Sequence, residues 1–123
     1  MGKVTTFEEI IAWQKARAFN RHLYLETYEE NFRKDLDLVR QIRRASVSIT
    51  SNIAEGFERH TDKELIQYLH FAKASAGEVR SQLYLAVDLD NLTPDIFDKL
   101  YHEITEISRL ISGFIKYLQN KIK

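Results

Sequence analysis

The chain has 123 residues, 44% of them hydrophobic, and its 18 Lys and Arg residues balance its 18 Asp and Glu residues. This length predicts one domain, spanning 1–123, with a single hydrophobic core. The absence of cysteine excludes a disulfide scaffold and thiolate chemistry, and one proline with four glycines disfavours a sheet with many tight turns. The balanced charge gives no strong attraction to nucleic acids or acidic membranes.

The N-terminal segment has no apolar stretch free of charge, so we expect no secretory signal. No window approaches the ~20 consecutive apolar residues of a membrane-spanning helix. Together with the absence of cysteine, these features favour a cytoplasmic protein without membrane association.

The first helix is predicted over 6–28. Thr6 is a good N-cap residue, and Glu8 and Glu9 follow it in the first turn, where carboxylates interact favourably with the positive end of the helix dipole. Apolar residues then recur at helical spacing. The polar segment 29–34 is expected to be the first connection.

Three more helices follow in the same chain. The second is predicted over 35–58, with a core stripe made by Leu38, Ile42, Ser46, Ile49, Ile53 and Phe57. The third, over 61–90, opens with a capping box, in which a threonine hydroxyl and a glutamate carboxylate satisfy each other's free amides. The fourth begins with Thr93 as N-cap and Pro94 at the first helical position, where a missing amide costs nothing.

These long amphipathic segments are joined by only a few residues each, which predicts that neighbouring helices run antiparallel. No strand pattern or internal repeat competes with this interpretation. The sequence therefore predicts an all-α protein, an antiparallel up-down-up-down four-helix bundle.

The second helix carries a stripe of small and polar residues beside its apolar stripe. Its members lie within a narrow arc of the helical wheel and are Gln41, Ala45, Ser48, Asn52 and Glu55. Such side chains allow close helix approach but need hydrogen-bond partners, so we interpret them as a packing or interface stripe. Glu55 is near the C-terminal end, where a carboxylate is disfavoured, which predicts a partner from another helix or another subunit.

Three arginines, Arg40, Arg43 and Arg44, occupy a third arc of the same helix. Within 33–60, six Lys and Arg residues exceed four Asp and Glu residues, a weak positive excess. A monomer with this charge would bind phosphates poorly. A ring that repeats the arginine arc in each subunit would bind nucleic acid by multivalency, and the three arginines are the predicted contacts.

The short connection near residue 60 predicts a register between the second and third helices. This register places Arg44 near Ser75 and Gln41 near Glu78. Arg43 or Arg44 is therefore predicted to form an ion pair with Glu78.

Several kinds of chemistry lack their residue patterns. The four histidines, His22, His60, His70 and His102, form no Glu-x-x-His, His-x-x-His or His-x-x-x-His pattern, so no metal or cofactor is expected. A Gly-rich phosphate loop and a nucleophile elbow are also missing from the sequence. We therefore expect a non-enzyme, and an RNA-processing enzyme that uses a histidine for acid–base chemistry is the least favoured interpretation.

The string QIRRASVSITSNIAEG at 41–56 resembles the signature of the four-helix-bundle proteins encoded in intervening sequences of bacterial 23S rRNA. The residues AWQKA at 12–16 and TDKE at 61–64 match further parts of that family's pattern, so the resemblance covers nearly the whole chain. Thr50 replaces a usual proline, which should leave the helix straighter. Ala74 replaces a usual glycine, which should loosen the closest helix contact.

The resemblance implies a homopentamer with no established enzymatic activity. Members of the family are similar to a pentameric accessory protein of diversity-generating retroelements, which implies binding of RNA or DNA and of a protein partner. We therefore expect a non-enzymatic oligomeric interaction module associated with nucleic acid. The alternative is a structural or protein-partner scaffold without nucleic-acid affinity. In either case the expected structural or interface stripe consists of Gln41, Ser48, Asn52, Glu55 and Glu78.

Overall fold

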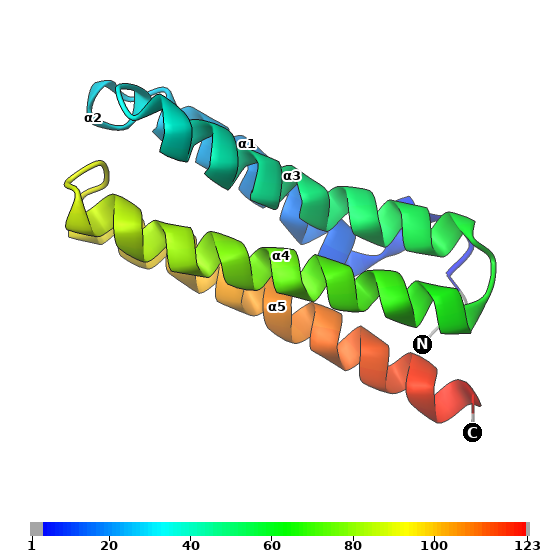
Figure 1. The fold of residues 1–123 in the computed structure, drawn as a ribbon. Helices are drawn as coiled ribbons and strands as arrows, with labels where there is room; N and C mark the ends of the chain where they lie inside the picture. Colours follow the sequence, from blue (N-terminus) through cyan, green and yellow to red (C-terminus); the bar gives the residue numbers. More distant parts are fainter. Residues whose placement is uncertain (1–3, 123) are drawn as a thin grey trace.

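The structure, a computed structural model, describes residues 4–122. Its four long helices are α1 (Ile11–Thr27), α3 (Leu36–Glu58), α4 (Asp62–Asp88) and α5 (Pro94–Ile122). Successive long helices run in opposite directions, which gives the predicted up-down-up-down bundle (Figure 1). No strand occurs in this part of the chain, so the predicted all-α class is confirmed.

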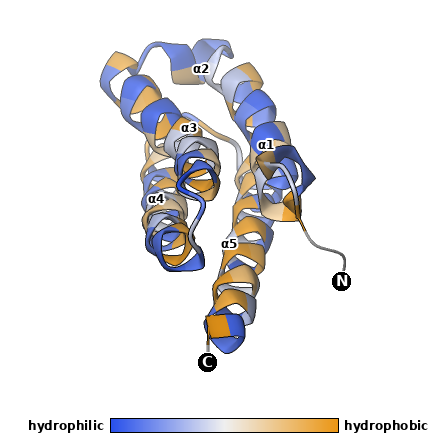
Figure 2. Cartoon of the chain, turned by 90° about the vertical axis from the view of Figure 1, so that its right-hand side faces the viewer, coloured by the Kyte–Doolittle hydropathy of each residue, from blue (hydrophilic) through white to orange (hydrophobic). Residues whose placement is uncertain are grey.

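The bundle has two layers, with α1 and α3 in one and α4 and α5 in the other (Figure 1). Helix α3 packs on both α1 and α4, and α5 packs on both α4 and α1. The hydrophobic faces of all four helices point inward between the layers (Figure 2). The largest fully buried side chains include Phe19, Leu23, Ile42, Ile49, Ile53, Leu69, Leu83, Ile104 and Ile111. Burying each such side chain contributes roughly 1.5–3 kcal/mol, which makes this core the main source of stability.

The predicted helix starts are held by side-chain caps. The hydroxyl of Thr61 accepts a hydrogen bond from the amide of Glu64 at 3.2 Å, and the hydroxyl of Thr93 accepts one from the amide of Ile96 at 3.3 Å. The capping box at the start of α4 differs in one bond. The carboxylate of Glu64 accepts from the Thr61 hydroxyl at 3.2 Å and not from an amide.

The first helix begins later than predicted. Phe7–Glu9 form a single 3-10 turn, Ile10 is extended, and α1 starts at Ile11. The amides of Thr5 and Thr6 both donate to the Glu9 carboxylate at 2.9 Å, which closes this tight turn. The chain then changes direction at Ile10, whose side chain is buried.

The segment 29–34, expected to be a polar connection, contains a short helix. Residues Glu30–Arg33 form the short helix α2, and Phe32 is fully buried. The prediction missed this element because a single apolar residue in a polar run gives no periodicity. Burial of Phe32 in the end of the bundle supplies the reason for a defined conformation there.

Helices α3 and α4 are in close contact where Gly56 faces Tyr68. A Cβ atom added to Gly56 would lie 2.5 Å from the Cβ of Tyr68. Gly56 is therefore a contact residue inside α3. Ala74 is exposed on α4, so the expectation that it loosens the closest helix contact is wrong. Within residues 4–122, no helix combines the length and the apolar character that crossing a bilayer requires.

Candidate functional site

The predicted arginine arc lies on α3, and two of its members are exposed. Arg40 and Arg44 form no ion pair within 4.0 Å in the described part of the chain. With Asp37, Gln41 and Glu78 they line an open polar depression of about 250 Å³ between α3 and α4. The structure thus brings two predicted contact residues together with two members of the predicted stripe.

Arg43 points in another direction, toward α1. Its Nε donates to the hydroxyl of Thr27 at 2.8 Å, and its Nη2 donates to the carbonyl of Tyr24 at 3.4 Å. Its guanidinium also lies 4.2 Å from the ring centre of Tyr24 and 4.8 Å from that of Tyr28. These contacts join α3 to α1, and they pair the positive charge of Arg43 with groups of the same chain. Arg40 and Arg44 therefore remain as the arginines of the arc that can meet a partner.

The predicted ion pair with Glu78 is wrong. Arg44 shares the polar depression with Glu78, but no ion pair between them forms in the described residues. The Glu78 carboxylate accepts instead from the side-chain Nε2 of Gln82 at 3.4 Å. The helix register is displaced from the expected one by about one turn, so that Ser75 faces Ser48 and not Arg44. This register is set by the close packing of α3 and α4 near their connection, where Gly56 meets Tyr68. The expected register had been counted from the midpoint of the loop.

The small polar stripe of α3 faces α4. The hydroxyl of Ser48 forms a hydrogen bond with that of Ser75 across the two helices, and Asn52 donates to the carbonyl of Ser48 at 2.8 Å. Ala45 is buried in the same seam. Ser48 and Asn52 therefore form hydrogen bonds within the chain, while the small Ala45 allows the helices to approach closely.

Glu55 has the partner on another helix that its position required. Its carboxylate accepts from the hydroxyl of Tyr68 on α4 at 3.0 Å and from Arg59 at 3.0 Å. These two hydrogen bonds, that of Arg59 first, lower the pKa of Glu55 below its usual value. The prediction of a partner from another helix or subunit did not include Arg59, which lies one turn further along the chain.

A polar contact between α1 and α3 was also missed. The side chain of Asn20 accepts from the hydroxyl of Ser46 and donates to that of Thr50 at 3.3 Å. Ser46 is fully buried. A serine in a core stripe needs a hydrogen-bond partner, and this requirement was the available signal. The sequence could not show which helix supplies that partner.

The described residues contain no group of three or more His, Asp or Glu side chains that could hold a metal ion. The ring of His22 lies 2.7 Å from the carboxylate of Glu103, and both side chains are accessible to solvent. His60 lies in the turn between α3 and α4 with a positive φ of 66°.

The fold and this surface place the protein among the all-α helical bundles, with a polar outer face that carries arginines. A family model for the 23S rRNA-intervening sequence protein matches residues 8–113, and the chain belongs to this family. A crystal structure of a protein of unknown function from the S23 ribosomal protein family of Bacteroides thetaiotaomicron is similar, with a TM-score of 0.79 and 26% identity. The match covers 86% of this chain and 96% of that one. No curated protein matches the chain.

Proposed function

We propose that the protein is a non-enzymatic, homo-oligomeric binding module that contacts RNA or DNA through Arg40 and Arg44. One observation carries this proposal: both guanidinium groups are exposed and have no ion-pair partner in residues 4–122. Arg59, in contrast, is held by Glu55 and Glu64. Unpaired guanidinium groups suit phosphate, which they bind through two hydrogen bonds at once.

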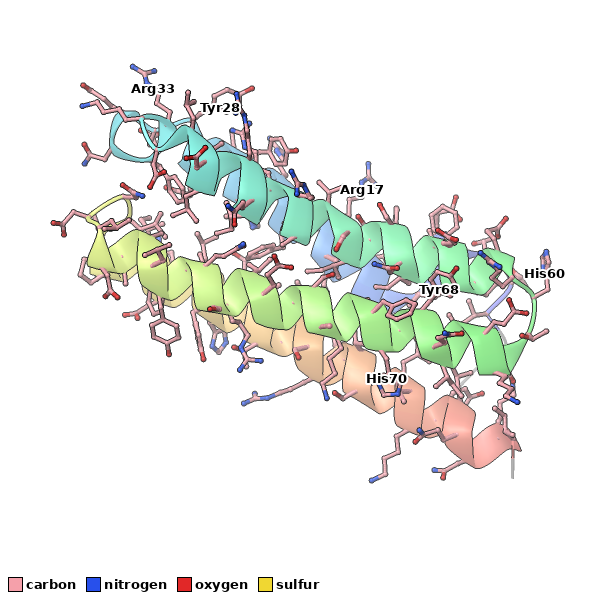
Figure 3. The ribbon with its side chains drawn as sticks, in the orientation of Figure 1. Arg17, Tyr28, Arg33, His60, Tyr68 and His70 are labelled. Atoms are coloured by element: carbon pink, nitrogen blue, oxygen red, sulfur yellow. The ribbon has the colours of Figure 1, made fainter. Side chains whose placement is uncertain are left out.

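The distribution of charge between the layers supports the same surface. The range 11–60, which contains α1 and α3, has nine Lys and Arg residues against seven Asp and Glu residues, whereas 61–122 has seven against nine. Arg17 and Arg33 both point outward on the side of α1 and α3 (Figure 3). A polyanion would therefore meet the α1–α3 layer and avoid the α4–α5 layer.

The local charge also explains why binding of a polyanion needs several copies of the chain. Asp37 and Glu78 lie in the same depression as the two arginines, so one chain offers little net positive potential. A homopentamer, as the family resemblance implies, would present ten such arginines at once, two per chain, and bind by effective concentration. A cytoplasmic location, expected from the cysteine-free sequence, belongs to this proposal.

The test is a salt titration of binding to a structured RNA and to a DNA duplex. The double variant Arg40→Gln, Arg44→Gln should lower the affinity and reduce the slope of log K against log salt by about 0.7–0.9 for each phosphate that the protein no longer neutralises. The matched control is Lys73→Gln, Lys116→Gln, which removes the same charge from exposed sites on α4 and α5. Equal binding by both double variants would favour the alternative, a scaffold without nucleic-acid affinity.

The subunit count is a separate measurement. Light scattering of the wild type and of both double variants should give the same oligomer, because these side chains are exposed in the single chain. If the arginine variant dissociates while the lysine variant does not, the arginines belong to a subunit interface and the protein-scaffold alternative gains.

A further inference from the structure

An apolar groove lies beside the C-terminal part of α5. It shares no lining residue with the depression that contains Arg40 and Arg44. Its volume of about 770 Å³ falls within the ~300–1,000 Å³ typical of small-molecule sites. Segments from five parts of the chain form it: the N-terminal turn, the start of α1, the end of α3 at Phe57, the start of α4 and the C-terminal half of α5. Its apolar wall includes Ile10, Ile11, Leu65, Leu110, Phe114 and Tyr117.

The C-terminal turns of α5 extend past the start of α1 (Figure 1), and the groove is lined by these turns. A second apolar stripe on α5 lies beside the core and consists of Leu110, Gly113, Phe114 and Tyr117 at helical spacing. Leu110 and Phe114 are half-buried against the core. Ile11 on the opposite wall is 53% exposed, and Tyr117 is 39% exposed. Apolar surface in contact with water is unfavourable by roughly 25 cal/mol per Å², so an apolar ligand that covers this stripe would be stabilised.

The groove is elongated along α5. Its lining on that helix extends from Arg109 to Lys121. At ~1.5 Å per residue this distance is about 18 Å. An extended chain can lie along such a groove, whereas a compact ring system would cover only part of it.

The charged side chains at the rim indicate which end group would fit. Asp62 and Lys121 form an ion pair at 3.2 Å and so neutralise each other. The Glu9 carboxylate accepts from the Thr5 hydroxyl at 2.6 Å and from two backbone amides. Arg109 forms no ion pair in the described residues and is exposed.

We propose that this groove binds an elongated amphiphile of the fatty-acid class, with its alkyl chain along α5 and its carboxylate on the guanidinium of Arg109. Arginine binds carboxylates through two parallel hydrogen bonds, and the apolar wall would cover the chain. The site is separate from Arg40 and Arg44, so it can be tested whether or not nucleic acid binds.

Two glycines provide a test that leaves the fold intact. A Cβ atom added to Gly113 meets no atom within 4 Å, and the same holds for Gly77 on α4. Gly113 lines the groove and Gly77 does not. The variant Gly113→Leu should therefore fill the groove, while Gly77→Leu adds the same side chain elsewhere as a matched control.

The probe is dodecanoate, titrated by calorimetry below its micelle concentration into the full chain. We expect saturable binding of one molecule per chain to the wild type and to Gly77→Leu, and at least tenfold weaker binding to Gly113→Leu. Absence of saturable binding to the wild type overturns the proposal. Equal affinities of the two leucine variants also overturn it, because the molecule would then bind outside the groove.

A second comparison tests the role of Arg109. Arg109→Gln should weaken dodecanoate binding by about threefold to tenfold, the range for one charge-assisted contact near the surface, and leave binding of neutral dodecanol unchanged. An equal loss for both probes contradicts the carboxylate assignment. If Gly113→Leu instead changes the subunit count in light scattering and the wild type binds no dodecanoate, the groove is a protein interface and the proposal fails.

Discussion

The contact between Gly56 and Tyr68 makes a quantitative prediction about the α3–α4 interface. In a helix interior, replacing glycine by alanine ordinarily stabilises a protein by about 1 kcal/mol. At Gly56 the added Cβ would lie 2.5 Å from the Cβ of Tyr68 and 3.2 Å from Cδ1 of Leu65. The Cβ of Tyr68 is fixed to the backbone of α4, so the helices must separate to relieve the overlap.

Overpacking of this kind costs about 1–3 kcal/mol, and a clash with a backbone-linked atom belongs at the upper end of that range. After the helix-propensity gain, we expect Gly56→Ala to lose about 1–2 kcal/mol. The matched controls are Gly77→Ala and Gly113→Ala, where the new Cβ meets no atom within 4 Å. These two variants should gain up to about 1 kcal/mol.

The assay is urea unfolding followed by circular dichroism at one fixed protein concentration, because stability of an oligomer depends on concentration. The unfolding midpoint should fall for Gly56→Ala and rise or stay constant for the two controls. If Gly56→Ala is as stable as Gly77→Ala, the close approach of α3 and α4 does not limit the side chain at this position, and the reasoning is refuted.

Three further predictions concern single side chains. Phe32→Ala should cost about 3–5 kcal/mol in urea unfolding because the ring is fully buried, and a loss below about 1 kcal/mol would show that α2 is a loose connection. Arg43→Gln should lower the thermal midpoint more than Arg40→Gln, since only Arg43 stacks on Tyr24; equal midpoints would contradict this difference. Because the pKa of Glu55 is lowered in the folded state, its ionised carboxylate stabilises the fold at pH values above the usual carboxyl pKa. This stabilisation is lost as the pH falls through the pKa of the folded state. The midpoints of wild type and Glu55→Gln should therefore differ near neutral pH and converge in acid, and a difference that persists unchanged in acid would argue against the network.

Local sequence signals determined most of the secondary structure. The starts of α4 and α5 were predicted correctly because Thr61 and Thr93 act on amides only three residues away. The bundle topology followed from helical periodicity and short connections, which depend on neighbouring residues alone. The start of α1 was misplaced because the tight turn at Glu9 precedes the helix and uses the same capping residues.

The candidate site depended on information that spacing does not contain. The helical wheel placed Arg40, Arg43 and Arg44 in one arc of α3, but it could not show that Arg43 turns toward Tyr24 of α1 and Tyr28 just after it. A helical wheel gives the direction in which a side chain leaves its own helix. The position of the neighbouring helix decides whether that direction leads to water or to a partner.

The sequence by itself determined an all-α bundle of four long helices and a polar, arginine-bearing second face on α3, because both follow from the chemistry of residues at most a few turns apart. Only the tertiary structure decided that Ser48 faces Ser75, that Tyr68 reaches Glu55, and that α5 extends past α1 to leave a groove. Each of these features depends on how far one helix is displaced along another. Packing of the complete core sets that displacement, and no local pattern records it.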